Sequence, residues 1–112
     1  MLSAVYYRFS VMEEYSVVIS LEAEADIDEV YDYIAFGVMA PETAVRYYMG
    51  IYDTIQNLSI VGAMLAISQQ PSLRKRYGAD VRTVCYKKMT IVYSIIGNVV
   101  YVRRVMAGSL IY

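Results

Sequence analysis

The chain is short and apolar, and its composition excludes several classes of protein. Its 112 residues suffice for one domain, and 58% of them are hydrophobic, against roughly 45–50% in typical soluble domains. It contains no histidine and one cysteine, Cys85, which excludes a histidine general base, an internal disulfide and a cysteine–histidine zinc site. No apolar run approaches the roughly 18 residues of a membrane-spanning helix, and the N-terminus lacks the basic start of a signal peptide. We therefore expect a cytoplasmic protein with no membrane association, no metal and no cofactor.

Charge is divided between the two parts of the chain. Residues 1–70 carry ten acids and two bases, for a net charge of −8, whereas residues 71–112 carry eight bases and one acid, for +7. A basic half suits a polyanion or an acidic protein as partner, and the alternative is that the two halves offset each other within the fold. The high apolar fraction is also open to two interpretations, a dense core or an exposed patch that a partner covers.

The first part of the chain predicts a strand and a helix. Residues 1–14 show no periodicity and are expected to be a lead-in segment, with Met12 as an alternative natural start. Residues 15–21 are rich in β-branched and aromatic side chains, which favours a strand. Ser20 is suited to be the N-cap of a helix that ends at Gly37. One face of this helix carries Ile27, Val30, Tyr31 and Ile34, spaced as in an amphipathic helix.

A second helix is expected to begin at Pro41, because proline suits the first helical position. Its apolar stripe consists of Ala44, Tyr48, Ile51, Ile55 and Leu58. The short connection between the two helices predicts an antiparallel hairpin. Residues 60–68 are apolar without a clear period, and residues 69–80 are expected to be a basic loop.

The last part of the chain predicts three strands, over residues 81–86, 90–96 and 99–106. Gly97 and Asn98 suit a tight hairpin turn between the last two. The predicted order is therefore β-α-α-β-β-β, an α+β fold with an antiparallel sheet and the helical hairpin packed on one face. We expect a single domain over residues 15–112, with the other face of the sheet open for function. The tyrosines are expected to serve core and interface packing.

Candidate chemical groups are few. Glu22, Asp26 and Glu29 recur on the first helix, but a solvated helix face with favourable N-terminal charge accounts for them. The chain has no glycine-rich phosphate loop and no Ser-His-Asp set. The sequence therefore offers no catalytic motif of its own, and any functional prediction depends on the order of its elements.

An ordered pattern runs through most of the chain. It comprises A-x-A-D-I-D-E-V-Y-D-Y-I over residues 23–34, A-V-R-Y-Y-x-x-I-Y-D-T-I-x-x-L over 44–58, V-R-T-V over 81–84, I-V-Y-S-I over 91–95 and V-V-Y-V-R-R-V-M-A-G over 99–108. From Tyr15 onward this pattern resembles the RelE/ParE superfamily of small toxins from bacterial toxin–antitoxin pairs, also called plasmid stabilisation proteins. The resemblance implies a cognate antitoxin as partner, within a homodimer or a hetero-oligomer. It also implies DNA gyrase or the ribosome as target.

The resemblance also suggests site residues. In the ribonuclease branch, positions matching Arg82 and Arg104 look like groups that hold RNA phosphate, and Tyr112 aligns with a tyrosine of that branch. Guanidinium groups bind phosphate in a bidentate manner and offset charge that develops in phosphoryl transfer. The candidates for target binding are Arg82, Lys87, Lys88, Arg103 and Arg104. For Arg82 the alternative is a buried anchor or an ion pair, and Arg103 and Arg104 are expected to face opposite sides of their strand.

The chain departs from the ribonuclease branch near its end, where alanine and leucine stand in place of a histidine and an arginine. RNA cleavage requires a base and an acid within reach, and Tyr112 is the one candidate. This departure favours the ParE-like branch, which looks like a group of gyrase inhibitors without established catalytic residues. Two alternatives stay open: a ribosome-dependent endoribonuclease that uses Arg82, Arg104 and Tyr112, and a degenerate, non-toxic binding module of the same fold.

Overall fold

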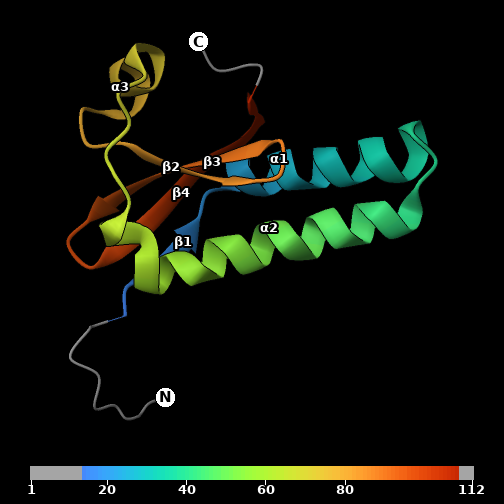
Figure 1. Cartoon of the computed structure of the whole chain (residues 1–112), viewed down its shortest axis with the longest axis horizontal. Coiled ribbons are helices and arrows are strands. Elements are labelled where there is room, and N and C mark those ends of the chain that lie inside the picture. The colour runs from blue at the N-terminus through green and yellow to red at the C-terminus, as the bar shows by residue number, and fades with distance from the viewer. Residues whose placement is uncertain (1–13, 109–112) are drawn as a thin grey trace.

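The computed structural model describes residues 14–108, so Met12, Tyr112 and all but the last residue of the predicted lead-in lie outside the described residues. Its helices and strands follow the predicted order, with one additional helix (Figure 1). They are β1 (Ser16–Ile19), α1 (Leu21–Asp32), the π-helical turn η1 (Tyr33–Gly37), α2 (Pro41–Val61), the 3-10 turn η2 (Gly62–Met64), α3 (Pro71–Tyr77), β2 (Arg82–Tyr86), β3 (Met89–Ile96) and β4 (Val99–Ala107).

The four strands form one sheet in the order β1-β4-β3-β2. Strands β2, β3 and β4 pair as an antiparallel meander, as predicted. β1 differs, because it pairs parallel with β4, from Ser16 opposite Val99 to Ile19 opposite Val102. A parallel pair requires a long connection, and here two long helices and two strands separate β1 from β4 along the chain. The predicted α+β class and the helical hairpin are confirmed, and the sheet is mixed rather than fully antiparallel.

Local sequence signals determine where the hairpin helices begin and end. The Ser20 hydroxyl accepts a hydrogen bond from the Ala23 amide at 2.9 Å and donates one to the Arg103 carbonyl at 2.9 Å, so the predicted N-cap also ties α1 to β4. Beyond α1, the π-helical turn η1 ends at Gly37, the predicted end of the first helix. Pro41 occupies the first position of α2, as predicted.

The main core lies between the helical hairpin and one face of the sheet. The hairpin contributes Ala23, Ile27, Ile51, Ile55 and Leu58, all at most 1% exposed, and the sheet contributes Ile91, Tyr93, Val100, Val102 and Val105. Burial of apolar surface on this scale is the dominant favourable term in folding. Ile27, Ile51, Ile55 and Leu58 of the predicted stripes supply this core, whereas Tyr31 and Tyr48 lie outside it, and Tyr48 is 40% exposed.

The opposite face of the sheet carries a second, smaller core. The predicted basic loop over residues 69–80 is wrong in part, because residues 71–77 form α3. Pro71 starts this helix, and Leu73 is buried against Val81 and Val92 of the sheet. One buried leucine thus stabilises a helical turn that the polar local sequence does not suggest. The face expected to be open is partly covered by α3. No helix within residues 14–108 has the length and apolarity needed to cross a membrane.

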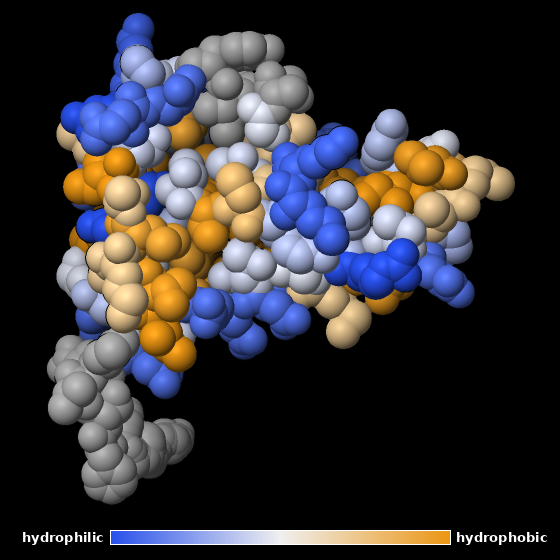
Figure 2. Space-filling view, in the orientation of Figure 1, coloured by the Kyte–Doolittle hydropathy of each residue, from blue (hydrophilic) through white to orange (hydrophobic). Residues whose placement is uncertain are grey.

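The hairpin reaches well beyond the sheet, which makes the molecule elongated, with extents of 46 × 33 × 21 Å (Figure 1). Figure 2 shows apolar surface at the end of the hairpin that lies away from the sheet. The large apolar side chains exposed in this part are Tyr33, Phe36, Val38, Met39, Val45, Tyr48 and Met49. Part of the high apolar content is therefore surface rather than core.

Candidate functional site

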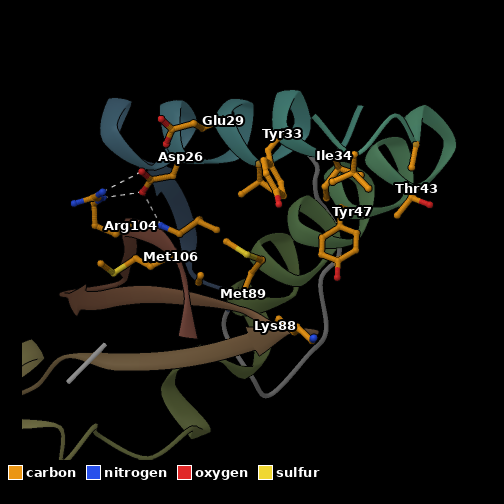
Figure 3. A pocket seen from close by; sticks show the side chains of 15 residues that line it. Asp26, Glu29, Tyr33, Ile34, Thr43, Tyr47, Lys88, Met89, Arg104 and Met106 are labelled. Carbon is orange, nitrogen blue, oxygen red and sulfur yellow. Dashed lines mark hydrogen bonds and ion pairs between the residues drawn. The ribbon is translucent and has the colours of Figure 1, made fainter. Parts of the chain in front are cut away.

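A groove opens where the hairpin passes the end of the sheet (Figure 3). It has a volume of about 650 Å³ and lies between α1, η1 and the start of α2 on one side and β3 and β4 on the other. We call it the sheet-side groove. Its apolar lining includes Val30, Tyr33, Ile34, Val38, Met89 and Met106, and its charged groups are Asp26, Glu29, Lys88 and Arg104. A mainly apolar cleft with few charges is typical of a surface that binds an apolar segment of another protein.

One end of this groove is closed by an ion pair between α1 and β4 (Figure 3). The Arg104 guanidinium donates from Nε and Nη2 to the two Asp26 oxygens at 2.7 and 3.0 Å, and the Val105 amide donates to Asp26 Oδ2 at 2.9 Å. The hydrogen bonds with Asp26 raise the pKa of Arg104, which keeps the guanidinium charged. A candidate phosphate-binding arginine is therefore held by a carboxylate of its own chain.

Asp26 corrects the expectation that the acids of the first helix are solvated. Its side chain is 12% exposed and it has three hydrogen-bond donors, whereas Glu22 and Glu29 are exposed. A signal for this role is present in the sequence, because Asp26 falls between Ala23 and Ile27 on the buried stripe of α1. A polar residue on an apolar stripe requires a partner when it is buried.

The Arg82 side chain reaches from the start of β2 to the segment that follows α2, where it binds main-chain carbonyl groups. Its Nη1 donates to the carbonyls of Ala63, at 3.1 Å, and Leu65, while the Tyr93 hydroxyl donates to the Gly62 carbonyl at 2.7 Å. These carbonyl groups follow the last turn of the helix and lack helical partners. A cation is also favourable at the negative end of a helix. This geometry corresponds to the anchoring role considered for Arg82, and contact with a target stays a prediction.

Burial affects the tyrosine of the same cluster. Tyr93 is fully buried, and this burial raises the pKa of its phenol to about 12, against the opposing effect of the nearby Arg82 charge. The neutral hydroxyl is therefore the form that binds the Gly62 carbonyl. Arg82 and Tyr93 together fix the chain as it leaves α2.

Arg103 faces the side of the sheet that carries α3. Its guanidinium lies 5.5 Å from the centre of the Tyr77 ring and 3.5 Å from the Ser94 hydroxyl, and the Arg76 guanidinium lies 5.7 Å from the same ring. Tyr77 also favours the charged form of Arg104. Strand alternation was expected to separate Arg103 from Arg104, and their contacts differ: Arg103 meets Tyr77 and Ser94, whereas Arg104 pairs with Asp26 of α1. The pairing register of β3 and β4 shifts at this point, between Val92 and Tyr93.

Tyr77 is the residue that sequence reasoning missed on this face. It lies within the predicted loop, and only the packing of α3 on the sheet brings it to Arg103. A basic run followed by an aromatic residue, as in residues 74–77, was the available signal. The result is an aromatic ring with two guanidinium groups over it, those of Arg76 and Arg103, an arrangement suited to anions.

Lys87 and Lys88 occupy the turn between β2 and β3. Lys87 has a positive φ of 52°, and its ammonium lies 5.6 Å from the centre of the Tyr86 ring, whereas Lys88 lines the sheet-side groove. Tyr86 packs directly on the α2 backbone at Gly50, where a Cβ atom would lie 2.1 Å from the ring. The five predicted target-binding residues are therefore divided among four places: the end of α2 for Arg82, Tyr77 for Arg103, Tyr86 for Lys87, and the sheet-side groove for Lys88 and Arg104. Among residues 14–108 no group of three His, Cys, Asp or Glu side chains is arranged to hold a metal ion.

Comparison with known proteins supports the fold but not an activity. No family model matches the chain, and no curated protein matches it in sequence. A solved structure described as the chromosomal ParDE TA system from P. aeruginosa contains a chain that superposes with a TM-score of 0.65. The chain therefore shares the fold of that chain from the ParDE system. The match covers 84% of this chain and 96% of that chain at 22% sequence identity, so the likeness concerns architecture.

Proposed function

We propose that this chain is the toxin of a bacterial toxin–antitoxin pair, of the ParE-like kind, which acts in the cytoplasm. In this proposal it inhibits growth by binding DNA gyrase and is neutralised by a cognate antitoxin. The observation that carries the proposal is the superposition on a chain from a ParDE system over most of both chains. The sequence pattern over residues 23–108 supports the same family independently of the structure.

The sheet-side groove supports the antitoxin part of the proposal. Its lining is mainly apolar, and two of the lining residues, Tyr33 and Val38, are 68% and 53% exposed. Exposed apolar surface of this extent is costly for a protein that functions alone. We propose that a segment of the antitoxin fills this groove and folds as it binds, because disordered tails bind apolar surfaces in this way.

The chemistry of the arginines favours gyrase binding over RNA cleavage. Arg82 donates from Nη1 to main-chain carbonyls, and Arg104 donates from Nε and Nη2 to both Asp26 oxygens, so each guanidinium already has a structural role within the chain. The chain also lacks histidine, the usual general base. We therefore propose that Arg103, together with Lys87 and Lys88, contacts the target, and that Arg82 and Arg104 act mainly as framework.

A second candidate function is a ribosome-dependent endoribonuclease of the RelE kind. The observation in its favour is the cluster around Tyr77, where Arg76 and Arg103 lie over the ring on the side of the sheet away from the hairpin. Guanidinium groups and an aromatic ring together suit RNA phosphate and bases. The third alternative is a degenerate module with this fold and no toxicity.

One experiment separates the three candidates. The gene is induced in a bacterium without antitoxin, and amino-acid incorporation, cell length and growth are followed over the first minutes. Gyrase inhibition predicts stalled growth and filamentous cells while translation continues, and it predicts that the purified protein blocks supercoiling by purified gyrase. An immediate collapse of translation overturns the proposal in favour of the ribonuclease. Normal growth favours the degenerate module.

The antitoxin part has its own test, which uses the open reading frame next to this gene. Co-expression of its product is expected to restore growth to cells that produce the toxin. Val38→Glu places a charge in the sheet-side groove and is expected to remain toxic but to escape neutralisation. Ile60→Glu is the matched control, since Ile60 is 44% exposed and lies outside the groove. Equal neutralisation of both variants would show that the antitoxin binds elsewhere.

A further inference from the structure

The two hairpin helices form a second groove that shares no lining residue with the sheet-side groove. It has a volume of about 550 Å³ and is lined by Asp28, Tyr31, Asp32, Val45 and Tyr48. We call it the tyrosine groove. Neither the toxin fold nor the proposed function assigns it a role, and its side chains come from α1 and α2 alone.

Aromatic rings form the floor of the tyrosine groove. The rings of Tyr31 and Tyr48 meet edge to face with centres 5.9 Å apart, and Tyr52 continues the row with its ring centre 4.9 Å from that of Tyr48. Tyr48 remains 40% exposed although it contacts both neighbours. The face of an aromatic ring is electronegative and attracts cations, arginine more often than lysine.

Carboxylates follow the same row of rings along one side. Glu24, Asp28 and Asp32 recur every four residues on α1, and like charges at this spacing destabilise a helix. Asp28 and Asp32 line the groove together with Tyr31 and Tyr48. Burial raises the pKa of Tyr52, and its neighbours Tyr48, Glu24 and Asp28 raise it further. Within residues 14–108 no lysine or arginine lies within ion-pair distance of the three acids. A cationic occupant would therefore remove repulsion as well as form new contacts.

The spacing of the acids indicates the shape of the occupant. Four residues of α-helix advance about 6 Å, so Asp28 and Asp32 in the groove are separated by that interval, and Glu24 continues the same spacing along α1 beyond the lining. In a helical segment, basic residues at every fourth position recur at this same interval of about 6 Å. In an extended segment, basic residues at every second position recur at about 6.6 Å, which is nearly the same. Arginine fits better than lysine because its planar guanidinium can stack on a ring while it binds a carboxylate.

We propose that the tyrosine groove binds a basic protein segment whose arginines or lysines recur at about 6 Å, each cation pairing with a carboxylate of α1 beside the tyrosine rings. The charge complementarity of an acidic, aromatic groove with a basic segment carries this assignment. The site does not depend on toxicity or on the sheet-side groove. It would therefore stand if the chain proved to be the degenerate module.

The test uses the full chain and a fluorescent helical peptide of alanine and glutamine with three arginines at every fourth position. We expect binding at about 0.1 M salt by fluorescence anisotropy and no binding of the peptide with glutamine in place of arginine. The triple variant E24Q/D28N/D32N is expected to bind the arginine peptide about tenfold more weakly, and Tyr48→Leu about threefold more weakly, because it loses a cation–π contact. Circular dichroism verifies that each variant is folded.

A matched triple variant, E22Q/E42Q/D53N, removes the same charge from exposed acids that do not line the groove. It is expected to bind within about twofold of the unmodified chain, since distant surface charges are largely screened. If both triple variants weakened peptide binding equally, the loss of binding would be due to net charge alone, and the proposal would be overturned. Failure of both the helical peptide and an extended peptide with alternating arginines to bind would also overturn it. So would binding of spermine at this groove without binding of either peptide.

Discussion

The two halves of the helical hairpin are built from the same kinds of side chain but have different surroundings. Near the sheet, Ile27, Ile51 and Ile55 are at most 1% exposed. Beyond the sheet, Phe36 is 72% and Met39 is 80% exposed. The difference arises because the hairpin continues past the strands, so its outer half has no sheet to cover it (Figure 1). Apolar side chains therefore form the core in the inner half of the hairpin, whereas in the outer half they form a surface that a partner can bind.

Truncation of a core residue in the inner half is expected to have the largest effect on stability. Ile51→Ala removes a fully buried side chain between α2 and the sheet. It is expected to lower the free energy of unfolding by about 2–5 kcal/mol, because lost burial and a residual cavity both contribute. Urea titration followed by circular dichroism measures the change. A loss below about 1 kcal/mol would mean that the inner half is as loosely packed as the outer half.

Removal of the ion pair at the end of the sheet-side groove is expected to rank next. Asp26→Ala leaves the Arg104 guanidinium and the Val105 amide without their carboxylate. The expected loss is about 2 kcal/mol, less than for a fully buried pair because the two side chains are 12% and 25% exposed. Glu22→Ala, at an exposed position of the same helix, is the control and is expected to cost less than about 0.5 kcal/mol.

A smaller, pH-dependent effect is expected at the end of α2. Because the folded-state pKa of Tyr93 is raised from 10.0 to about 12, folding favours the protonated phenol. This contribution to stability is fully present below pH 10 and is lost as the pH rises towards 12. Tyr93→Phe, which also deletes the bond to the Gly62 carbonyl, is expected to cost about 1 kcal/mol near neutral pH. The stability difference between the two proteins should narrow above pH 10.

The smallest change in stability is expected at the tip of the hairpin. Met39→Ser removes an apolar side chain that is 80% exposed, and it should alter the free energy of unfolding by less than about 0.5 kcal/mol. Size-exclusion chromatography of the same variant is expected to show less self-association or surface adsorption than the unmodified chain. A loss of stability as large as that of Ile51→Ala would show that the outer half of the hairpin is covered in solution. The inner and outer halves would then both be buried.

Local sequence signals predicted most of the fold and little of the site. The serine N-cap, Pro41, Gly97 and the apolar stripes act over a few residues, so they identified the helical hairpin and the β-meander. The parallel pairing of β1 and the helix around Leu73 depend on contacts between distant segments, which no local pattern encodes. For the same reason, the roles of Asp26 and Tyr77 emerged only when the packing brought their partners into contact with them.

The pairing of the first described strand with the last has a consequence for the order of folding. Ile19 can pair with Val102 only after Val102 has been synthesised, so β1 cannot join the sheet while the chain is still short. Contacts between residues far apart in sequence slow folding, because the intervening chain must first be brought together. During translation, the inner face of the hairpin therefore emerges before β4, its last cover, and stays open to solvent. A helper protein that acts on the nascent chain would encounter this face before the native sheet exists.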